Sequence, residues 1–195
     1  MPREQREQTI LAAASAEFAA SGYAGAHMSV IAANAEVSKA LVLSYFGSKE
    51  DLYVACVRRA GETLAGAIGD AIPVQSAGAT DGERVLEAIF ATLADRPSDW
   101  PVLYDRSVPA GRARDAAREQ RTILRQQAAG GVSRALAAVG LDDPGDLSAA
   151  TVVWEHIVSA LVKWWQHHPD ESAADMTARA RRVLTAASGR PADRG

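Results

Sequence analysis

The chain has 195 residues, enough for one large domain or two small ones, and 48% of them are hydrophobic. Its net charge of -3 excludes binding to nucleic acid through bulk positive charge, so any DNA contact must come from a local arrangement. The single cysteine, Cys56, excludes an internal disulfide and a cysteine-based metal site. Because the sequence shows neither a signal peptide nor a long apolar run, we expect a soluble cytoplasmic protein without a membrane segment.

The abundant Ala and Leu of the whole chain favour an all-α fold, and the N-terminal part predicts three helices. An apolar stripe predicts a helix over residues 4–20, closed by Ser21-Gly22 because glycine tolerates the left-handed conformation. Residues 28–46 predict two short helices joined by a tight turn, with Ser38 as the cap of the second. Such a pair packs against a third helix and leaves its second member free to enter a major groove.

Helical periodicity continues through the rest of the chain and predicts about nine helices in all. Ser48 and Asp51 form a capping pair that starts a helix over residues 49–72. A loop over 74–82 follows, and further helices are expected up to Arg96, over 98–108, over 112–139, over 147–168 and near the C-terminus. We expect the charged first half of the 112–139 helix to face solvent. Its buried stripe should comprise Ile123, Leu124, Val132, Leu136 and Val139.

The helix over 147–168 is apolar on more than one face, which indicates burial on two sides. The simplest second partner is another copy of the chain. Charged substitutions at Val158 or Leu161 are therefore expected to disrupt a homodimer.

Several short blocks in the first quarter of the chain agree in order and spacing with a known family. These blocks are Gly22-Tyr23, VIA at 30–32, AEVSK at 35–39 and YFGSKEDL at 45–52. Together they resemble the N-terminal domain of TetR-family transcriptional regulators. The resemblance implies a helix-turn-helix domain over 1–47 and a larger helical ligand-binding and dimerisation domain over 48–189. It also implies dimerisation through the last two helices. The residues after the last helix, 190–195, are expected to form a tail.

The chain departs from the family pattern at three positions. Ala26 replaces the usual capping threonine or serine, Glu36 replaces a common turn glycine, and Leu43 replaces a tyrosine that often contacts phosphate. Adopting the glycine-like backbone at Glu36 costs roughly 1 kcal/mol.

Seven residues are the candidate DNA contacts. Lys39 lies in the first turn of the second short helix, where it can reach base edges or phosphate, and Ala40 and Leu41 suit thymine methyl groups. Leu41 could equally pack in the core. The remaining candidates are the potential backbone contacts Ser38, Ser44 and Tyr45, and Lys49, which resembles the family's phosphate-binding lysine.

Two further assignments have structural alternatives, and so does the basic N-terminus. Ser38 serves first as a cap, and Tyr45 could equally pack on the first helix. Arg3 and Arg6 form either a short arm along the DNA or part of a disordered terminus.

Seven residues of the second half could line a cavity for a small apolar ligand. They are Phe90, Trp100, Tyr104, Trp154, His156, Ile157 and Trp164. Aromatic side chains at helical spacing are also typical of a core, so we expect one or two of the seven to contact a ligand. No catalytic, metal or cofactor signature is present in the sequence.

These features predict a homodimeric transcriptional regulator, a repressor released by an unknown small-molecule effector, that binds a near-palindromic double-stranded operator. No enzymatic activity is expected. One alternative is a degenerate helix-turn-helix protein that binds another protein, since residues 1–52 contain four basic and six acidic side chains. The other is a small-molecule-binding protein without a DNA function.

Overall fold

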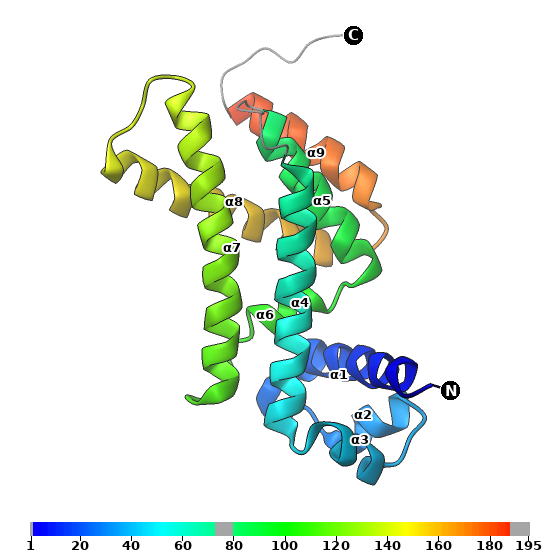
Figure 1. The fold of residues 1–195 in the computed structure, drawn as a ribbon. Coiled ribbons are helices and arrows are strands. Elements are labelled where there is room, and N and C mark those ends of the chain that lie inside the picture. Colours follow the sequence, from blue (N-terminus) through cyan, green and yellow to red (C-terminus); the bar gives the residue numbers. More distant parts are fainter. Residues whose placement is uncertain (1, 73–79, 188–195) are drawn as a thin grey trace. The chain divides into compact units, whose positions relative to one another are not determined.

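The computed structural model describes residues 2–72 and 80–187, and every regular element in these ranges is an α-helix (Figure 1). The described helices are α1 (Arg3–Gly25), α2 (Met28–Asn34), α3 (Lys39–Phe46), α4 (Lys49–Ala71), α5 (Thr80–Asp95), α6 (Asp99–Leu103), α7 (Arg112–Ala137), α8 (Pro144–Gln166) and α9 (Ala173–Ala187). The all-α prediction is confirmed. Most of the predicted loop over 74–82 and the predicted tail over 190–195 lie outside the described residues.

The chain divides into two compact units that do not follow the order of the sequence. The first unit comprises residues 1–63 and 96–123, and the second comprises residues 64–95 and 124–195. Helices α4 and α7 therefore each contribute to both units. The functional division predicted at residue 47 stays a prediction.

The first unit has an aromatic centre where α1 meets α4. The Tyr53 ring makes edge contacts with Phe18 and Tyr23, each at a centroid distance of 5.0 Å. The Tyr53 hydroxyl donates a hydrogen bond of 2.7 Å to the Val102 carbonyl, which fixes α6 to this centre. Tyr23 reaches it because Gly22 breaks α1 at φ 67° and ψ 167°, as the sequence predicts.

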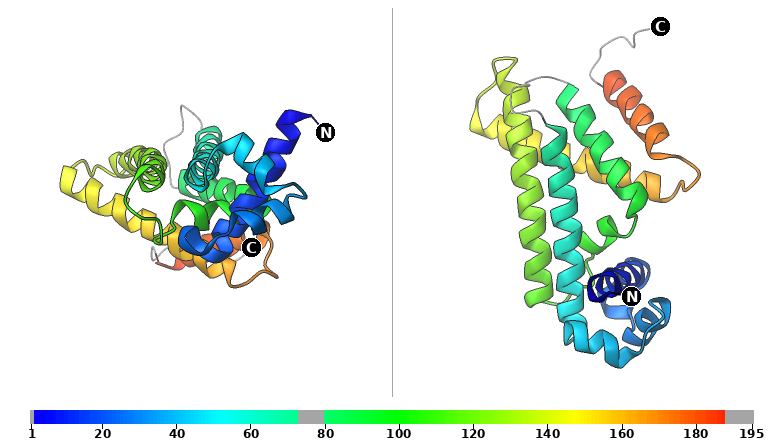
Figure 2. Two further views of the ribbon diagram at one scale, coloured as in Figure 1. Left: turned by 90° about the horizontal axis from the view of Figure 1, so that it is seen from below. Right: turned by 45° about the vertical axis from the view of Figure 1, so that its right-hand side comes forward.

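The second unit is built on α5 and α9, which lie side by side (Figure 2). Helix α5 buries one side through Leu86, Ile89, Phe90 and Leu93. The Phe90 ring packs edge-on against Trp165 of α8 at 5.5 Å between centroids. An ion pair of 3.0 Å joins Arg181 of α9 to Glu83 of α5.

Helix α6 is shorter than predicted, since it ends at Leu103 and not near 108. The chain leaves the helix there because its next residues bind the backbone at the end of α1. Asp105 accepts a hydrogen bond of 2.6 Å from the Tyr23 N–H, and the Ser107 hydroxyl accepts one of 3.3 Å from the Ala24 N–H. The last residues of the predicted loop, 80–82, belong to α5, which already begins at Thr80.

The predicted orientation of α7 is wrong. Its first half contributes a buried face of Ala113, Ala116, Ala117 and Gln120, although its charged side chains point elsewhere. None of the five residues of the predicted stripe is buried, and Val139 is 70% exposed. Small side chains explain the difference, because they allow α7 to approach α4 closely beside Gly61.

Helix α8 is apolar on two faces, as the sequence predicts. One face is buried within the chain and includes Val158 and Val162. On the other, Val152 and Val153 are exposed. Val158 is only 5% exposed, so a charged substitution there would test folding and not an interface; the choice of Val158 as an interface probe is therefore wrong.

Candidate nucleic-acid interface

The turn between α2 and α3 depends on a strained residue. Glu36 adopts φ 54°, the left-handed conformation that favours glycine. Two backbone hydrogen bonds close the turn, from the Glu36 N–H to Ala33 (3.0 Å) and from the Val37 N–H to Ala32 (2.9 Å). The chain therefore keeps the tight turn without the usual glycine.

Helix α2 begins without a side-chain cap. His27 occupies the capping position, and its side chain makes no capping hydrogen bond. Its backbone N–H instead donates to the Glu17 carboxylate at 3.1 Å. This contact ties the start of α2 to α1 and engages one of the acidic groups of the segment.

Helix α3 presents a mixed apolar and basic face to solvent. Ser38 caps it as predicted, since its hydroxyl accepts a hydrogen bond of 3.1 Å from the Leu41 N–H. Val42 is fully buried and anchors the inner side. The exposed outer side consists of Lys39, Ala40, Leu43 and Ser44. This face has the residue types that suit phosphate oxygens and thymine methyl groups.

The predicted DNA contacts fall into two groups around α3. Lys39, Ala40 and Ser44 lie on the outer face, whereas Leu41 and Tyr45 are half-buried at its edges. Leu43 is 37% exposed on the outer face but is not among the predicted contacts. Its spacing of four residues from Lys39 is the helical signal that identifies it.

The basic side chains beside α3 rest on tyrosine rings. The Lys49 ammonium lies 4.9 Å from the centroid of the Tyr23 ring. The Arg3 guanidinium lies 5.2 Å from the centroid of the Tyr45 ring. Within the described part of the chain neither cation forms a salt bridge. Cation–π contacts therefore hold both charges without neutralising them.

Two acidic residues at the start of α4 have partners within the first unit. Asp51 accepts a hydrogen bond of 2.6 Å from the Ser48 hydroxyl and pairs with Arg112 at 2.9 Å. The Ser48 hydrogen bond, with a further contribution from Arg112, holds the pKa of the Asp51 carboxyl below its ordinary value. Glu50 accepts a hydrogen bond of 3.2 Å from the Ala113 N–H at the start of α7. The net acidity of residues 1–52 therefore overstates the free negative charge around α3.

The candidate ligand residues are divided between the two units. In the first unit the Trp100 and Tyr104 rings stack at 4.5 Å between centroids. Trp100 is buried, and its indole N–H has no hydrogen-bond partner in the described structure. Phe90 belongs to the second unit, where it is packed on Trp165.

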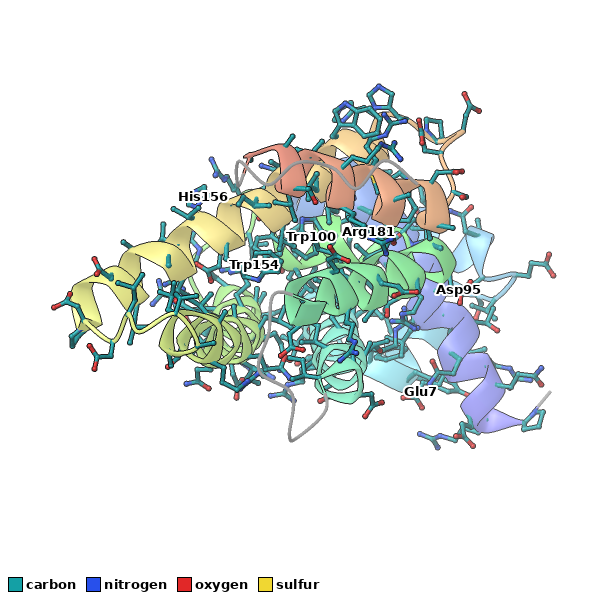
Figure 3. The ribbon with its side chains drawn as sticks, turned by 90° about the horizontal axis from the view of Figure 1, so that it is seen from above. Glu7, Asp95, Trp100, Trp154, His156 and Arg181 are labelled. Carbon is teal, nitrogen blue, oxygen red and sulfur yellow. The ribbon has the colours of Figure 1, made fainter. Side chains whose placement is uncertain are left out.

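The candidates on α8 differ in exposure. Trp154 and His156 project from opposite sides of the helix, and His156 points to solvent (Figure 3). Ile157 is half-buried. The Trp164 ring is exposed and stacks on His168 at 3.7 Å between centroids. Ligand contact by these residues stays a prediction.

Within residues 2–72 and 80–187, no cluster of three or more His, Cys, Asp or Glu side chains is suited to a metal ion. In the same two ranges, no helix has the length and apolar character that a membrane span requires.

Comparisons with known proteins agree with the geometry of α1–α4. Residues 10–56 match the model of the family described as bacterial regulatory proteins, tetR family. The HTH-type transcriptional activator FasR of Mycolicibacterium smegmatis is 33% identical over 105 residues, which are 54% of this chain and 48% of FasR. The chain thus matches about half the length of this curated relative.

Solved structures share the fold over nearly the whole chain. A TetR-like transcriptional regulator from Rhodococcus sp. RHA1 is 27% identical, with a TM-score of 0.63 over 95% of this chain and 98% of that chain. The regulator FadR from Bacillus subtilis, solved in complex with stearoyl-CoA, is 18% identical, with a TM-score of 0.73 over 91% and 95% of the two chains. At 18% identity, the similarity to FadR shows a shared fold.

Proposed function

We propose, from the premise that this chain belongs to the tetR family of bacterial regulatory proteins, that it is a sequence-specific DNA-binding regulator of transcription. The observation that carries the proposal is the exposed outer face of α3. The predicted alternative of a protein-binding helix-turn-helix rests on acidity, and it is weakened because Asp51 and Glu50 are engaged with α7.

Each residue near α3 has a proposed role that follows from its chemistry. Lys39 contacts phosphate or a base edge from the first turn, and Lys49 contacts phosphate from the start of α4. Ala40 and Leu43 contact thymine methyl groups. The Ser44 hydroxyl donates to the Leu41 carbonyl at 2.7 Å, so it is available to DNA chiefly as an acceptor.

Exposed apolar residues on α8 and on α9 support a homodimer. Val153 is 58% exposed on α8, and Val183 is 54% exposed on α9. Burial of such surface against a second copy would stabilise association. A two-fold dimer presents two α3 helices to a near-palindromic operator, with half-sites about one helical turn apart, roughly 34–36 Å.

A small-molecule effector completes the proposal. The unpartnered indole N–H of buried Trp100 supports this residue as an effector contact, because a buried donor without an acceptor is unfavourable. The complex of FadR with stearoyl-CoA supports testing acyl-CoA compounds first. We propose a cytoplasmic repressor without enzymatic activity. FasR is named as an activator. A reporter assay on the regulated promoter therefore tests whether this chain represses or activates transcription.

DNA binding is tested by fluorescence anisotropy with DNA from upstream of the chain's own gene, across a salt series. We expect sequence-specific binding that is strongly weakened in Lys39→Ala and Lys49→Ala, with a reduced salt dependence. Arg134→Ala, at an exposed position on α7, is the matched control. Absence of sequence-specific binding at low salt would sink the proposal and favour one of the alternatives without DNA.

The dimer is tested by sedimentation of the wild type and of Val153→Glu and Val183→Glu variants. Both positions are exposed, so the variants are expected to fold as monomers. Folding is checked by circular dichroism. If both variants remain well-folded dimers, the interface lies elsewhere.

A further inference from the structure

We propose that Arg3 and Tyr45 together form a phosphate-binding site at the edge of the DNA-reading face. The inference rests on the proposed function and adds a contact from α1 that neither the motif nor the description of any relative assigns. Its basis is the position of the Arg3 guanidinium, 5.2 Å from the centroid of the Tyr45 ring.

The pairing brings the start of α1 to the end of α3. Arg3 is the first residue of α1 and is exposed, so the basic N-terminus is helical here and not an extended arm. Tyr45 lies in the last turn of α3, next in sequence to Ser44 of the exposed face. Its ring is half-buried and also contacts Phe46, with 6.3 Å between centroids. The cation is therefore held by a ring that is itself packed.

The guanidinium keeps its hydrogen-bonding groups available in this arrangement. A planar guanidinium has five N–H donors and interacts with an aromatic ring through its charge and its face, which leaves N–H groups free for phosphate oxygens. Glu7 lies one helical turn after Arg3, yet no salt bridge joins the two. Arg3 thus carries a positive charge that no acidic side chain of the described structure offsets through an ion pair.

The location complements the basic residues already assigned to DNA. Lys39 lies at the N-terminal end of α3, whereas the Tyr45 ring holds Arg3 beside the C-terminal end. A cation at each end of the outer face matches the two phosphate backbones that border a major groove. Because the ring restricts the arginine side chain before DNA arrives, less conformational freedom is lost on binding.

The test uses the full chain and the operator DNA of the anisotropy assay. Arg3→Ala is expected to weaken binding about tenfold and to reduce the salt slope by about one per subunit. Tyr45→Ala should give a similar loss, and the double variant should lose little more, since both changes remove one site. Tyr45→Phe keeps the ring, so Arg3→Ala made in the Tyr45→Phe background should still weaken binding about tenfold. Arg134→Ala is again the control.

The outcomes distinguish this inference from the proposed function. Wild-type binding with an unchanged affinity and salt slope in Arg3→Ala overturns the inference and leaves the proposed function intact. Additive losses in the double variant overturn the pairing of the two residues. A wild-type chain that binds no DNA overturns both proposals. Circular dichroism checks the fold of each variant, and Tyr45→Leu, which removes the ring and keeps an apolar side chain, replaces Tyr45→Ala if that variant is unfolded.

Discussion

The close approach of α4 and α7 predicts opposite effects for alanine at two glycines of α4. Gly61 faces α7, and a Cβ atom placed there would lie 2.7 Å from the Cβ and 2.8 Å from the Cδ of Gln120, with Oε1 closer still. Gly66 lies on the same helix, and a Cβ atom placed there meets nothing within 4 Å. The two positions share a backbone conformation and differ in the space beside them.

The magnitude follows from two opposing contributions. Replacing a glycine by alanine in a helix interior stabilises the helix by about 1 kcal/mol. At Gly61 the Gln120 side chain can move its amide away, but its Cβ is fixed to α7, so the helices must separate. Overpacking of this kind costs about 1–3 kcal/mol. Gly66→Ala should therefore be stabilised, and Gly61→Ala should have about 1–3 kcal/mol less free energy of unfolding than Gly66→Ala.

Urea denaturation followed by circular dichroism measures both variants against the wild type. The comparison cancels helix propensity, so the difference between the two variants reports the packing of α4 against α7. For a chain of this size each kcal/mol corresponds to about 2–4 °C in melting temperature. Equal stabilisation of both variants would refute the contact between Gly61 and Gln120.

Three other predictions concern single side chains. Ser38→Ala removes the acceptor of the Leu41 N–H and should lower the free energy of unfolding, measured without DNA, by about 1 kcal/mol; unchanged stability would contradict the cap. The hydrogen bond from Ser48 lowers the pKa of folded Asp51, so this carboxylate contributes stability that is lost as the pH falls through that pKa. Asp51→Asn should be less stable than the wild type near neutral pH, and the difference should shrink in acid; a difference independent of pH would argue against this. Burial raises the pKa of the Cys56 thiol to about 11 and also shields it from reagents. A thiol reagent at mildly alkaline pH should therefore modify the native chain at least roughly 100-fold more slowly than the unfolded chain, whereas equal rates would disprove that burial.

Features encoded by neighbouring residues could be predicted from the sequence. Ser38 caps α3, Ser48 and Asp51 cap α4, and Gly22 breaks α1, because each depends on a local hydrogen bond or backbone conformation. The helix-turn-helix and the exposure of Lys39 follow from the same local patterns. This is why the motif-bearing quarter of the chain agrees best with the structure.

Features that join distant segments could not be predicted in the same way. The buried side of α7 consists of alanines and Gln120, which give a weak apolar signal beside the stronger stripe of its second half. The tyrosine rings that contact Lys49 and Arg3 belong to other helices, so no spacing in the sequence reveals these cation–π contacts. The acidic residues of α4 likewise find partners on α7, more than 60 residues away, which a count of charges over residues 1–52 misses.

The interleaving of the two units determines how this protein can be recombined with its relatives. The helix-turn-helix is held by residues from a second stretch of chain, through Tyr53 to Val102, Tyr23 to Asp105 and Glu50 to Ala113. A chimaera that transplants only residues 1–47 would separate Tyr23 from Asp105, and one that transplants only residues 1–63 would also separate Tyr53 from Val102 and Glu50 from Ala113. Exchanging residues 96–123 along with residues 1–63 would preserve all three contacts, so a graft of DNA specificity onto another effector domain requires two segments and three junctions.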